Sequence, residues 1–227
     1  MNDFTFYNPT RIEFGKDKES NIGTYISEYQ IKKVLIVYGS ERVKKNGLYD
    51  RVIKSLEKAG IQYVSLGGVV SNPLMSKVNE GIQMAKESQV EGVLAVGGGS
   101  VLDSVKAIAA GAKYDGDAWD FFIYKAVAKE ALPLFSILTL AATGSEMNNG
   151  SVVMNDETKQ KYAFMSPKTF PTVSVINPEL MNSVGRDYLA YSASDIIAHC
   201  LDLYFTAETI PELNLALIEN IIQTVIR

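Results

Sequence analysis

The feature that most constrains the fold is a run of three glycines, Gly97, Gly98 and Gly99, between an apolar segment and a helical pattern. Residues 93–96 are all apolar, which is typical of a strand covered on both faces in a parallel sheet. After the glycines, Ser100 and Asp103 have the spacing of a helix N-cap and a capping box. The stretch therefore predicts strand, glycine turn and helix, the unit that builds parallel α/β sheets.

A glycine turn that opens a helix is also a candidate phosphate site. Glycine allows positive φ and lets the backbone come close to a ligand. The helix N-terminus presents free N–H groups and the positive end of the helix dipole, and both favour a phosphate or pyrophosphate. The alternative is a tight turn without a ligand, but three consecutive glycines cost chain entropy and packing. The run matches neither G-x-G-x-x-G nor a Walker A loop, so we favour phosphate binding without support from those motifs.

The rest of the chain alternates between apolar runs and helical patterns. Two short strands are expected around Asn8–Thr10, and the other expected strands lie at 34–37, 63–66, 135–138, 151–154, 161–164 and 173–176. Helices are expected at 22–29, 41–45, 48–59 and around 78–85, and then from Arg186 and from Pro211. This order predicts right-handed crossovers and a parallel sheet whose ligands lie at the carboxyl ends of the strands. The boundary near residue 182 divides an α/β domain, 1–182, from the beginning of an all-helical domain, 183–227.

Composition excludes several classes of partner. The chain has 227 residues, 47% of them hydrophobic, a net charge of −4 and a pI of about 5.2. No basic stripe is visible, which argues against nucleic acid. No apolar stretch approaches the roughly 20 residues that cross a membrane, and no signal peptide is evident. A single cysteine, Cys200, excludes an internal disulfide framework and favours a reducing, cytoplasmic setting.

Two further stretches could carry chemistry. Asp195 and His199, the only histidine, are four residues apart on a predicted helix, so both side chains project from one face. Such a pair can share a divalent metal such as iron or zinc, although a surface Asp–His pair has the same spacing. Residues 139–146 are rich in small hydroxyl side chains, which suit either a nucleotide or an ordinary polar loop.

These motifs together resemble one known family. The matching sequence segments are Tyr38-Gly39-Ser40, Val43 to Gly47, Ser71-Asn72-Pro73, Gly97 to Asp103, Thr139 to Glu146, Lys161, and Asp195 with His199. These segments follow one another in collinear order over essentially the whole chain. Together they resemble the iron-containing (group III) alcohol dehydrogenases, most closely their NADPH-dependent butanol dehydrogenase or aldehyde reductase branch. The resemblance implies a Rossmann-like nucleotide domain and an all-helical metal domain with the active site between them.

The resemblance also implies roles for individual residues. It assigns the pyrophosphate and nicotinamide side to Gly97, Gly98, Gly99, Ser100 and Asp103. It assigns the rest of the nucleotide pocket to Thr139, Thr143, Asn148 and Lys161, with Asn72 near the ribose. Asp195 and His199 resemble the first two of four metal ligands. The family's other two ligands are histidines beyond position 227, so we expect the chain to be a fragment of a longer dehydrogenase.

Gly39 and Ser40 bear on the choice of cofactor. NAD-selective relatives carry an acidic residue near position 39, which accepts the ribose 2′-OH and repels a 2′-phosphate. Gly39 removes that repulsion, Ser40 can donate to phosphate, and Lys44 or Lys45 could neutralise it. The sequence therefore predicts NADP over NAD.

The predicted function is a metal-dependent alcohol dehydrogenase or aldehyde reductase that transfers hydride between NADP(H) and a small alcohol or aldehyde. No side chain is identified as the proton donor, and a homo-oligomer is expected because relatives form dimers or larger assemblies. One alternative is a nucleotide-binding module without catalysis. Another is a related metal enzyme such as a glycerol dehydrogenase or dehydroquinate synthase, against which residues 139–146 argue.

Overall fold

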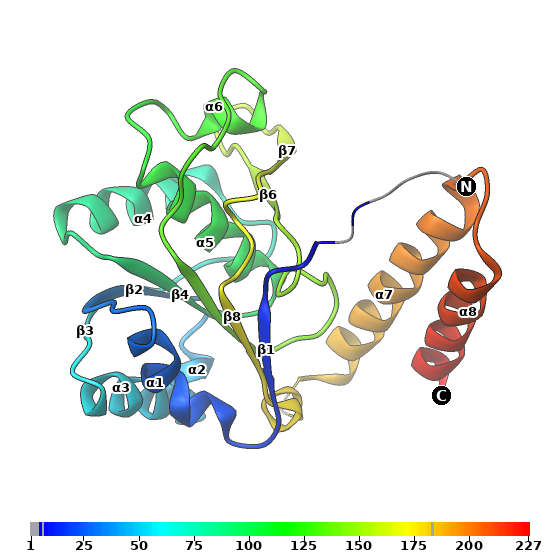
Figure 1. The fold of residues 1–227 in the computed structure, drawn as a ribbon, viewed down its shortest axis with the longest axis horizontal. Coiled ribbons are helices and arrows are strands. Elements are labelled where there is room, and N and C mark those ends of the chain that lie inside the picture. The colour runs from blue at the N-terminus through cyan, green and yellow to red at the C-terminus, as the bar shows by residue number, and fades with distance from the viewer. Residues whose placement is uncertain (1–4, 6, 183) are drawn as a thin grey trace.

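The protein is built on a six-stranded sheet in which every neighbouring pair of strands is parallel (Figure 1). The computed structural model describes residues 5, 7–182 and 184–227. In sheet order the strands are β1 (Arg11–Phe14), β8 (Val173–Ile176), β5 (Leu134–Leu138), β4 (Gly92–Gly97), β2 (Lys33–Tyr38) and β3 (Gln62–Leu66). The parallel α/β class predicted from the sequence is confirmed.

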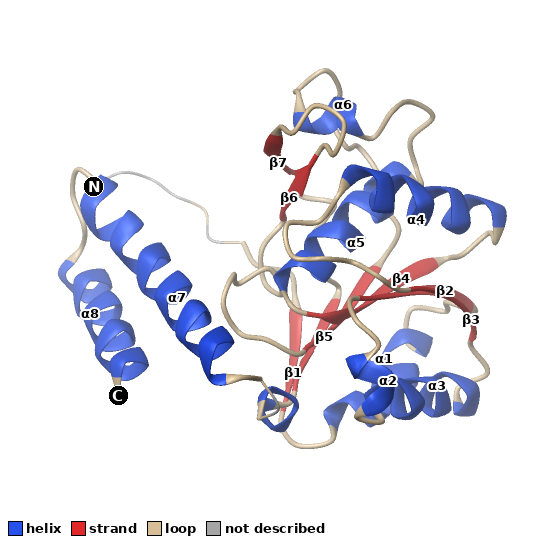
Figure 2. Cartoon of the chain, turned by 180° about the vertical axis from the view of Figure 1, so that it is seen from behind, coloured by secondary structure: helices blue, strands red, loops and turns tan. Residues whose placement is uncertain are grey.

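Helices cover both faces of this sheet (Figure 2). One face carries α1 (Ile22–Ser27), α2 (Arg42–Lys45) and α3 (Leu48–Lys58), and the other carries α4 (Met75–Glu87) and α5 (Gly99–Gly111). Along β2, Val34 and Ile36 pack in the core on the first face, whereas Leu35 and Val37 pack in the core on the second. The apolar runs of the sequence are continuous because successive side chains of each inner strand enter different cores.

A small antiparallel hairpin extends from the second face. Its strands are β6 (Gly150–Met154) and β7 (Lys161–Met165), as the sequence predicts. The aromatic segment that includes α6 (Trp119–Phe122) packs on the hairpin: the Trp119 ring lies 5.8 Å from the Tyr162 ring, and the Phe122 ring 4.9 Å from the Phe164 ring. This segment is therefore a packing element.

The last two helices, α7 (Arg186–Thr206) and α8 (Glu212–Ile226), lie side by side and are set off from the sheet (Figure 1). They follow the short helix η2 (Pro178–Met181); a similar turn, η1 (Lys18–Asn21), precedes α1. Large apolar side chains of the pair stay exposed, among them Leu203, Phe205, Leu213 and Leu217. None of the helices in the described ranges combines the length and apolarity needed to cross a membrane.

One local prediction is wrong. Helix α5 begins at Gly99 with Gly98 as its N-cap, so Ser100 lies inside the first turn and no capping box forms. The Asp103 carboxylate instead accepts a hydrogen bond from the backbone N–H of Val152 in the hairpin. The three glycines are also not used for positive φ, since none of them adopts it.

Of the two short strands expected around Asn8–Thr10, the second is β1, and the first falls on residues 4–7, of which 4 and 6 lie outside the described residues.

Candidate functional site: two cavities beside a glycine turn

The candidate site lies at the carboxyl ends of β2 and β4, which are neighbours in the sheet. The chain leaves β2 towards α2 and α3 on one face and leaves β4 towards α5 on the other. Such a topological switch opens a crevice where α/β proteins bind ligands. Two cavities occur there, of about 300 Å³ and about 520 Å³. Gly97 and Gly98 line the smaller cavity, and Gly99 and Ser100 line the larger one.

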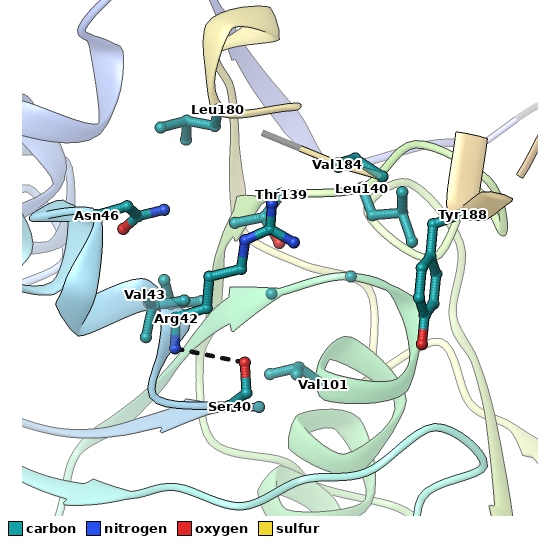
Figure 3. Close-up of a pocket in the computed structure, with 14 residues that line it drawn as sticks. Ser40, Arg42, Val43, Asn46, Val101, Thr139, Leu140, Leu180, Val184 and Tyr188 are labelled. Atoms are coloured by element: carbon teal, nitrogen blue, oxygen red, sulfur yellow. Dashed lines mark hydrogen bonds between the residues drawn. The ribbon is translucent and has the colours of Figure 1, made fainter. Parts of the chain in front are cut away.

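The smaller, first cavity has a polar end and an apolar end (Figure 3). At the polar end, Ser40 Oγ accepts a hydrogen bond of 3.4 Å from the Arg42 backbone N–H. The apolar end is formed by Leu140 and by Tyr188, whose ring descends from the first turn of α7. The cavity therefore joins the turn after β2 to the loop after β5 and to the helical segment.

The glycine turn is closely packed on both sides. A Cβ atom on Gly97 would lie 2.5 Å from Val101 Cγ2, and one on Gly99 would lie 2.5 Å from Thr143 Oγ1. A larger residue at either position would therefore have to displace the side chain of Val101 or Thr143. As residues of the first turn of α5, Gly99 and Ser100 have backbone N–H groups without an intrahelical acceptor, and they line the second cavity. The turn is thus suited to an anion as well as to tight packing.

The larger, second cavity is lined by many polar and charged residues. Asn72, at the loop after β3, has a φ of 54°, and its Oδ1 accepts a hydrogen bond of 2.7 Å from Lys161 Nζ of β7. Both residues line the cavity, together with Asp103, Thr143 and Asn148. Loops that are far apart in the sequence therefore meet around one space.

A buried lysine supports the wall of this cavity. Lys106 is fully buried, and its Nζ donates hydrogen bonds of 2.8 Å to Ser145 Oγ, Asn148 Oδ1 and the Gly150 carbonyl. Ser145 Oγ in turn donates to Asp103 Oδ1 at 2.6 Å. Burial lowers the pKa of Lys106 to about 8, against the opposing effect of the Asp103 and Glu146 carboxylates. Burial also raises the pKa of Asp103, while the Ser145 hydroxyl and the Lys106 ammonium act to lower it.

Asp195 and His199 face the same cavity from α7. The Oδ2 atom of Asp195 lies 3.8 Å from Nε2 of His199, one helical turn away. An imidazole and a carboxylate so placed offer one nitrogen and one oxygen donor to a single divalent cation. Within the described part of the chain, no group of three or more His, Cys, Asp or Glu side chains could hold a metal. The pair therefore fits a metal as part of a larger ligand set.

The structure places the predicted site residues in two groups. Gly39, Ser40 and Thr139 line the first cavity with Gly97 and Gly98. The second cavity is lined by the other nine: Asn72, Gly99, Ser100, Asp103, Thr143, Asn148, Lys161, Asp195 and His199.

Sequence reasoning missed Arg42 and Tyr188 in the first cavity and Lys106 beneath the second. The signal for Lys106 was a cationic residue within the otherwise apolar helical stretch 105–111, three residues after Asp103. Lys44 does not line the first cavity; its Nζ lies 3.0 Å from Glu41 Oε2 and 5.0 Å from the centre of the Tyr38 ring.

Comparison with known proteins identifies the family to which the chain is similar. The model of the family described as iron-containing alcohol dehydrogenase matches residues 9–178. The chain is 45% identical over 226 residues to the probable NADH-dependent butanol dehydrogenase 1 of Bacillus subtilis, and 34% identical to the NADPH-dependent aldehyde reductase YqhD of Escherichia coli. Each match covers all of this chain and 58% of the relative.

Solved structures of related enzymes superpose closely on this chain. NADH-dependent butanol dehydrogenase A from Thermotoga maritima superposes with a TM-score of 0.97 at 46% identity, over 99% of this chain and 56% of that one. Sulfoacetaldehyde reductase from Bifidobacterium kashiwanohense in complex with NAD+ superposes with a TM-score of 0.86 at 25% identity. The chain thus spans somewhat more than half the length of the proteins it matches.

Proposed function

The chain belongs to the iron-containing alcohol dehydrogenase family. We propose that it is part of a metal-dependent alcohol dehydrogenase or aldehyde reductase. The reaction is hydride transfer between a nicotinamide dinucleotide and a small alcohol or aldehyde. The observation that supports this most directly is the glycine turn between two cavities, one of which also holds Asp195 and His199.

The two cavities match the two halves of a dinucleotide. The apolar end of the first cavity suits adenine, and the glycine turn suits the pyrophosphate, which favours free N–H groups and a helix N-terminus. The second cavity would then receive the nicotinamide, with Asn72 and Lys161 near its ribose. In this arrangement the protein's contribution is mainly to orient the nicotinamide towards the substrate carbonyl carbon and to exclude water.

We propose NADP rather than NAD as the preferred cofactor. The support is local: Gly39 brings no negative charge, while Ser40 and Arg42 offer a hydroxyl and a guanidinium at the polar end of the first cavity. Arg42 replaces Lys44 and Lys45 as the proposed cationic partner of the 2′-phosphate. The curated relatives include both NADH-dependent and NADPH-dependent enzymes, so the test is a comparison of KM for NADPH and NADH. A marked preference for NADH contradicts this assignment.

Asp195 and His199 would hold a divalent cation, iron or zinc, together with ligands from elsewhere. When bound, such a cation acts as a Lewis acid that stabilises negative charge on the substrate oxygen. In the whole protein, Asp195→Ala and His199→Ala should each lower the metal content, measured by elemental analysis, and the activity together. Full metal occupancy and turnover in Asp195→Ala would show that this residue is not a ligand.

A second candidate function is dinucleotide binding without catalysis. It is favoured by the finding that Asp195 and His199 are only two donors and that no larger donor group occurs in the described ranges. Tight NADPH binding without aldehyde reduction, even with iron or zinc added, would support this function over the first.

The organisation of the protein is part of the proposal. We place the nucleotide domain at residues 1–182 and the beginning of the helical, metal-binding domain at 183–227. The single cysteine supports a reducing, cytoplasmic setting. A homo-oligomer follows from analogy with the family, and light scattering of the whole protein would test it.

A further inference from the structure

Lys106 is the charged group that the proposed function leaves unexplained. It lies in the middle of α5, fully buried, one turn beyond the residues that line the second cavity. A buried ammonium is costly unless all its protons are bonded. Here the three donors of Nζ meet three acceptors, on Ser145, Asn148 and Gly150. The arrangement is a complete site for the protonated amine.

The ammonium also determines the direction of the next hydrogen bond. Because a protonated lysine can only donate, Ser145 Oγ must accept from it and use its own proton towards Asp103. The neutral amine has one proton fewer and a lone pair, so it cannot serve all three acceptors and can itself accept from Ser145. Loss of the proton therefore loosens Asp103, Ser145 and Asn148, all three of which line the second cavity.

We propose that Lys106 is a positioning residue that holds this wall of the cavity for the dinucleotide, and that cofactor binding is coupled to its protonation. The proposal rests on the proposed function, because it assumes that a dinucleotide occupies this cavity. The ligand class that would show the coupling is anionic, since the negative charge of a pyrophosphate at Gly99 and Ser100 favours the ammonium over the amine.

The sign of the coupling follows from the groups around Lys106. Asp103 on its own helix and Glu146 on the loop before β6 favour the charged form, Lys161 of β7 acts on Asp103, and burial opposes charging most strongly. In the empty protein these effects leave the pKa of Lys106 at about 8. A bound polyanion raises that pKa, so the dinucleotide binds more tightly where Lys106 is protonated, and affinity falls as the pH rises through about 8.

The test is a fluorescence titration of the whole protein with NADPH at about pH 7 and about pH 9, on either side of the pKa of about 8. We expect the Kd of the unmodified protein to rise by roughly five- to tenfold between them. Lys106→Met should bind roughly tenfold more weakly at the lower pH and lose the pH step. The matched control is Lys113→Met, an exposed lysine just beyond the same helix, which should keep both the affinity and the step.

Ser145→Ala provides a second test that leaves the lysine in place, should Lys106→Met fail to fold. It removes the link between the ammonium and Asp103, so the pH step should become smaller. A full pH step in Ser145→Ala, or in a folded Lys106→Met, overturns the inference. If the unmodified protein binds neither NADPH nor NADH at either pH, the proposed function itself fails. If it binds NADPH equally at both, only the coupling fails.

Discussion

Arg42 lines the first cavity, whereas the lysines next to it in sequence do not. Lys44 is held by the Glu41 carboxylate and lies over the rings of Tyr38 and Tyr49. Hydrogen bonds to Tyr38 and Glu41 raise the pKa of Lys44, so its ammonium stays charged and bonded to these two residues. Among the described residues that line the first cavity, Arg42 is therefore the one with a cationic side chain.

We predict that Arg42→Ala raises the Kd for NADPH by roughly tenfold, since an arginine–phosphate pair is a charge-assisted interaction, and leaves the Kd for NADH within about twofold. Fluorescence titration with both cofactors measures this. Lys45→Ala, an exposed neighbour, is the control. If Lys45→Ala weakens NADPH binding and Arg42→Ala does not, the assignment of the cation is wrong.

Among single residues, the sequence predicted those site residues that are close to one another along the chain. Asp195 and His199 come together because four residues make one helical turn, and the glycines were found because they are consecutive. The partners of Lys106 are about forty residues away in sequence, at Ser145 and beyond, so no local pattern could reveal them. The choice between Arg42 and Lys44 depends on which side chain a neighbouring carboxylate engages, which spacing does not show.

Among the elements, the packing of α1 on α3 depends on one glycine. The backbone N–H of Gly23 donates a hydrogen bond of 3.0 Å to Ser55 Oγ, and a Cβ on Gly23 would come within 2.1 Å of the Ser55 carbonyl oxygen. Backbone cannot move aside as a flexible side chain can, so the two helices could not stay at this separation with any larger residue.

We expect Gly23→Ala to lower the free energy of unfolding by about 3 kcal/mol, the upper range for overpacking a buried contact. Urea denaturation measures the change. Gly185→Ala is the matched control, because a Cβ there meets nothing within 4 Å. An unchanged midpoint for Gly23→Ala would mean that α1 shifts without cost and that the close contact is not required.

The elements themselves were predicted well where apolar runs or helical periodicity were strong, as in β2, β4, α3 and α5. The start of α5 was predicted wrongly because donors from elsewhere in the fold compete with the local backbone N–H groups for the Asp103 carboxylate. Asp103 has the spacing of a local cap, yet its carboxylate accepts from Ser145 and from Val152. Tertiary contacts with Ser145 and with the hairpin, 42 and 49 residues downstream, therefore override the capping pattern.

For the whole molecule, α7, like α5, faces both cavities. Tyr188 lines the first cavity, and Asp195 and His199 line the second, from the same side of the helix. A dinucleotide that spans the glycine turn would therefore contact α7 near both ends of the ligand. The order of strands in the sheet, by contrast, follows from no local pattern, and the sequence did not predict that β1 pairs with β8.

We predict that NADPH slows amide hydrogen exchange in residues 186–199 of the whole protein, because the ligand fastens this stretch at two points. Mass spectrometry of exchanged peptides measures the effect, and α3, which lines neither cavity, provides the unaffected reference. Slower exchange at Gly97 to Asp103 with no change in α7 would contradict a ligand that reaches across both cavities.

The pairing of β1 with β8 bears on how the chain is made. Arg11 lies opposite Val173, so β1 has as its neighbour a strand that is synthesised much later than itself. Until that neighbour emerges, β1 has an open edge and no place in the sheet. Strands β2 to β5 pair only with one another and with β8, so they can assemble in the order of their synthesis, whereas β1 can join the sheet only after β8 has been made.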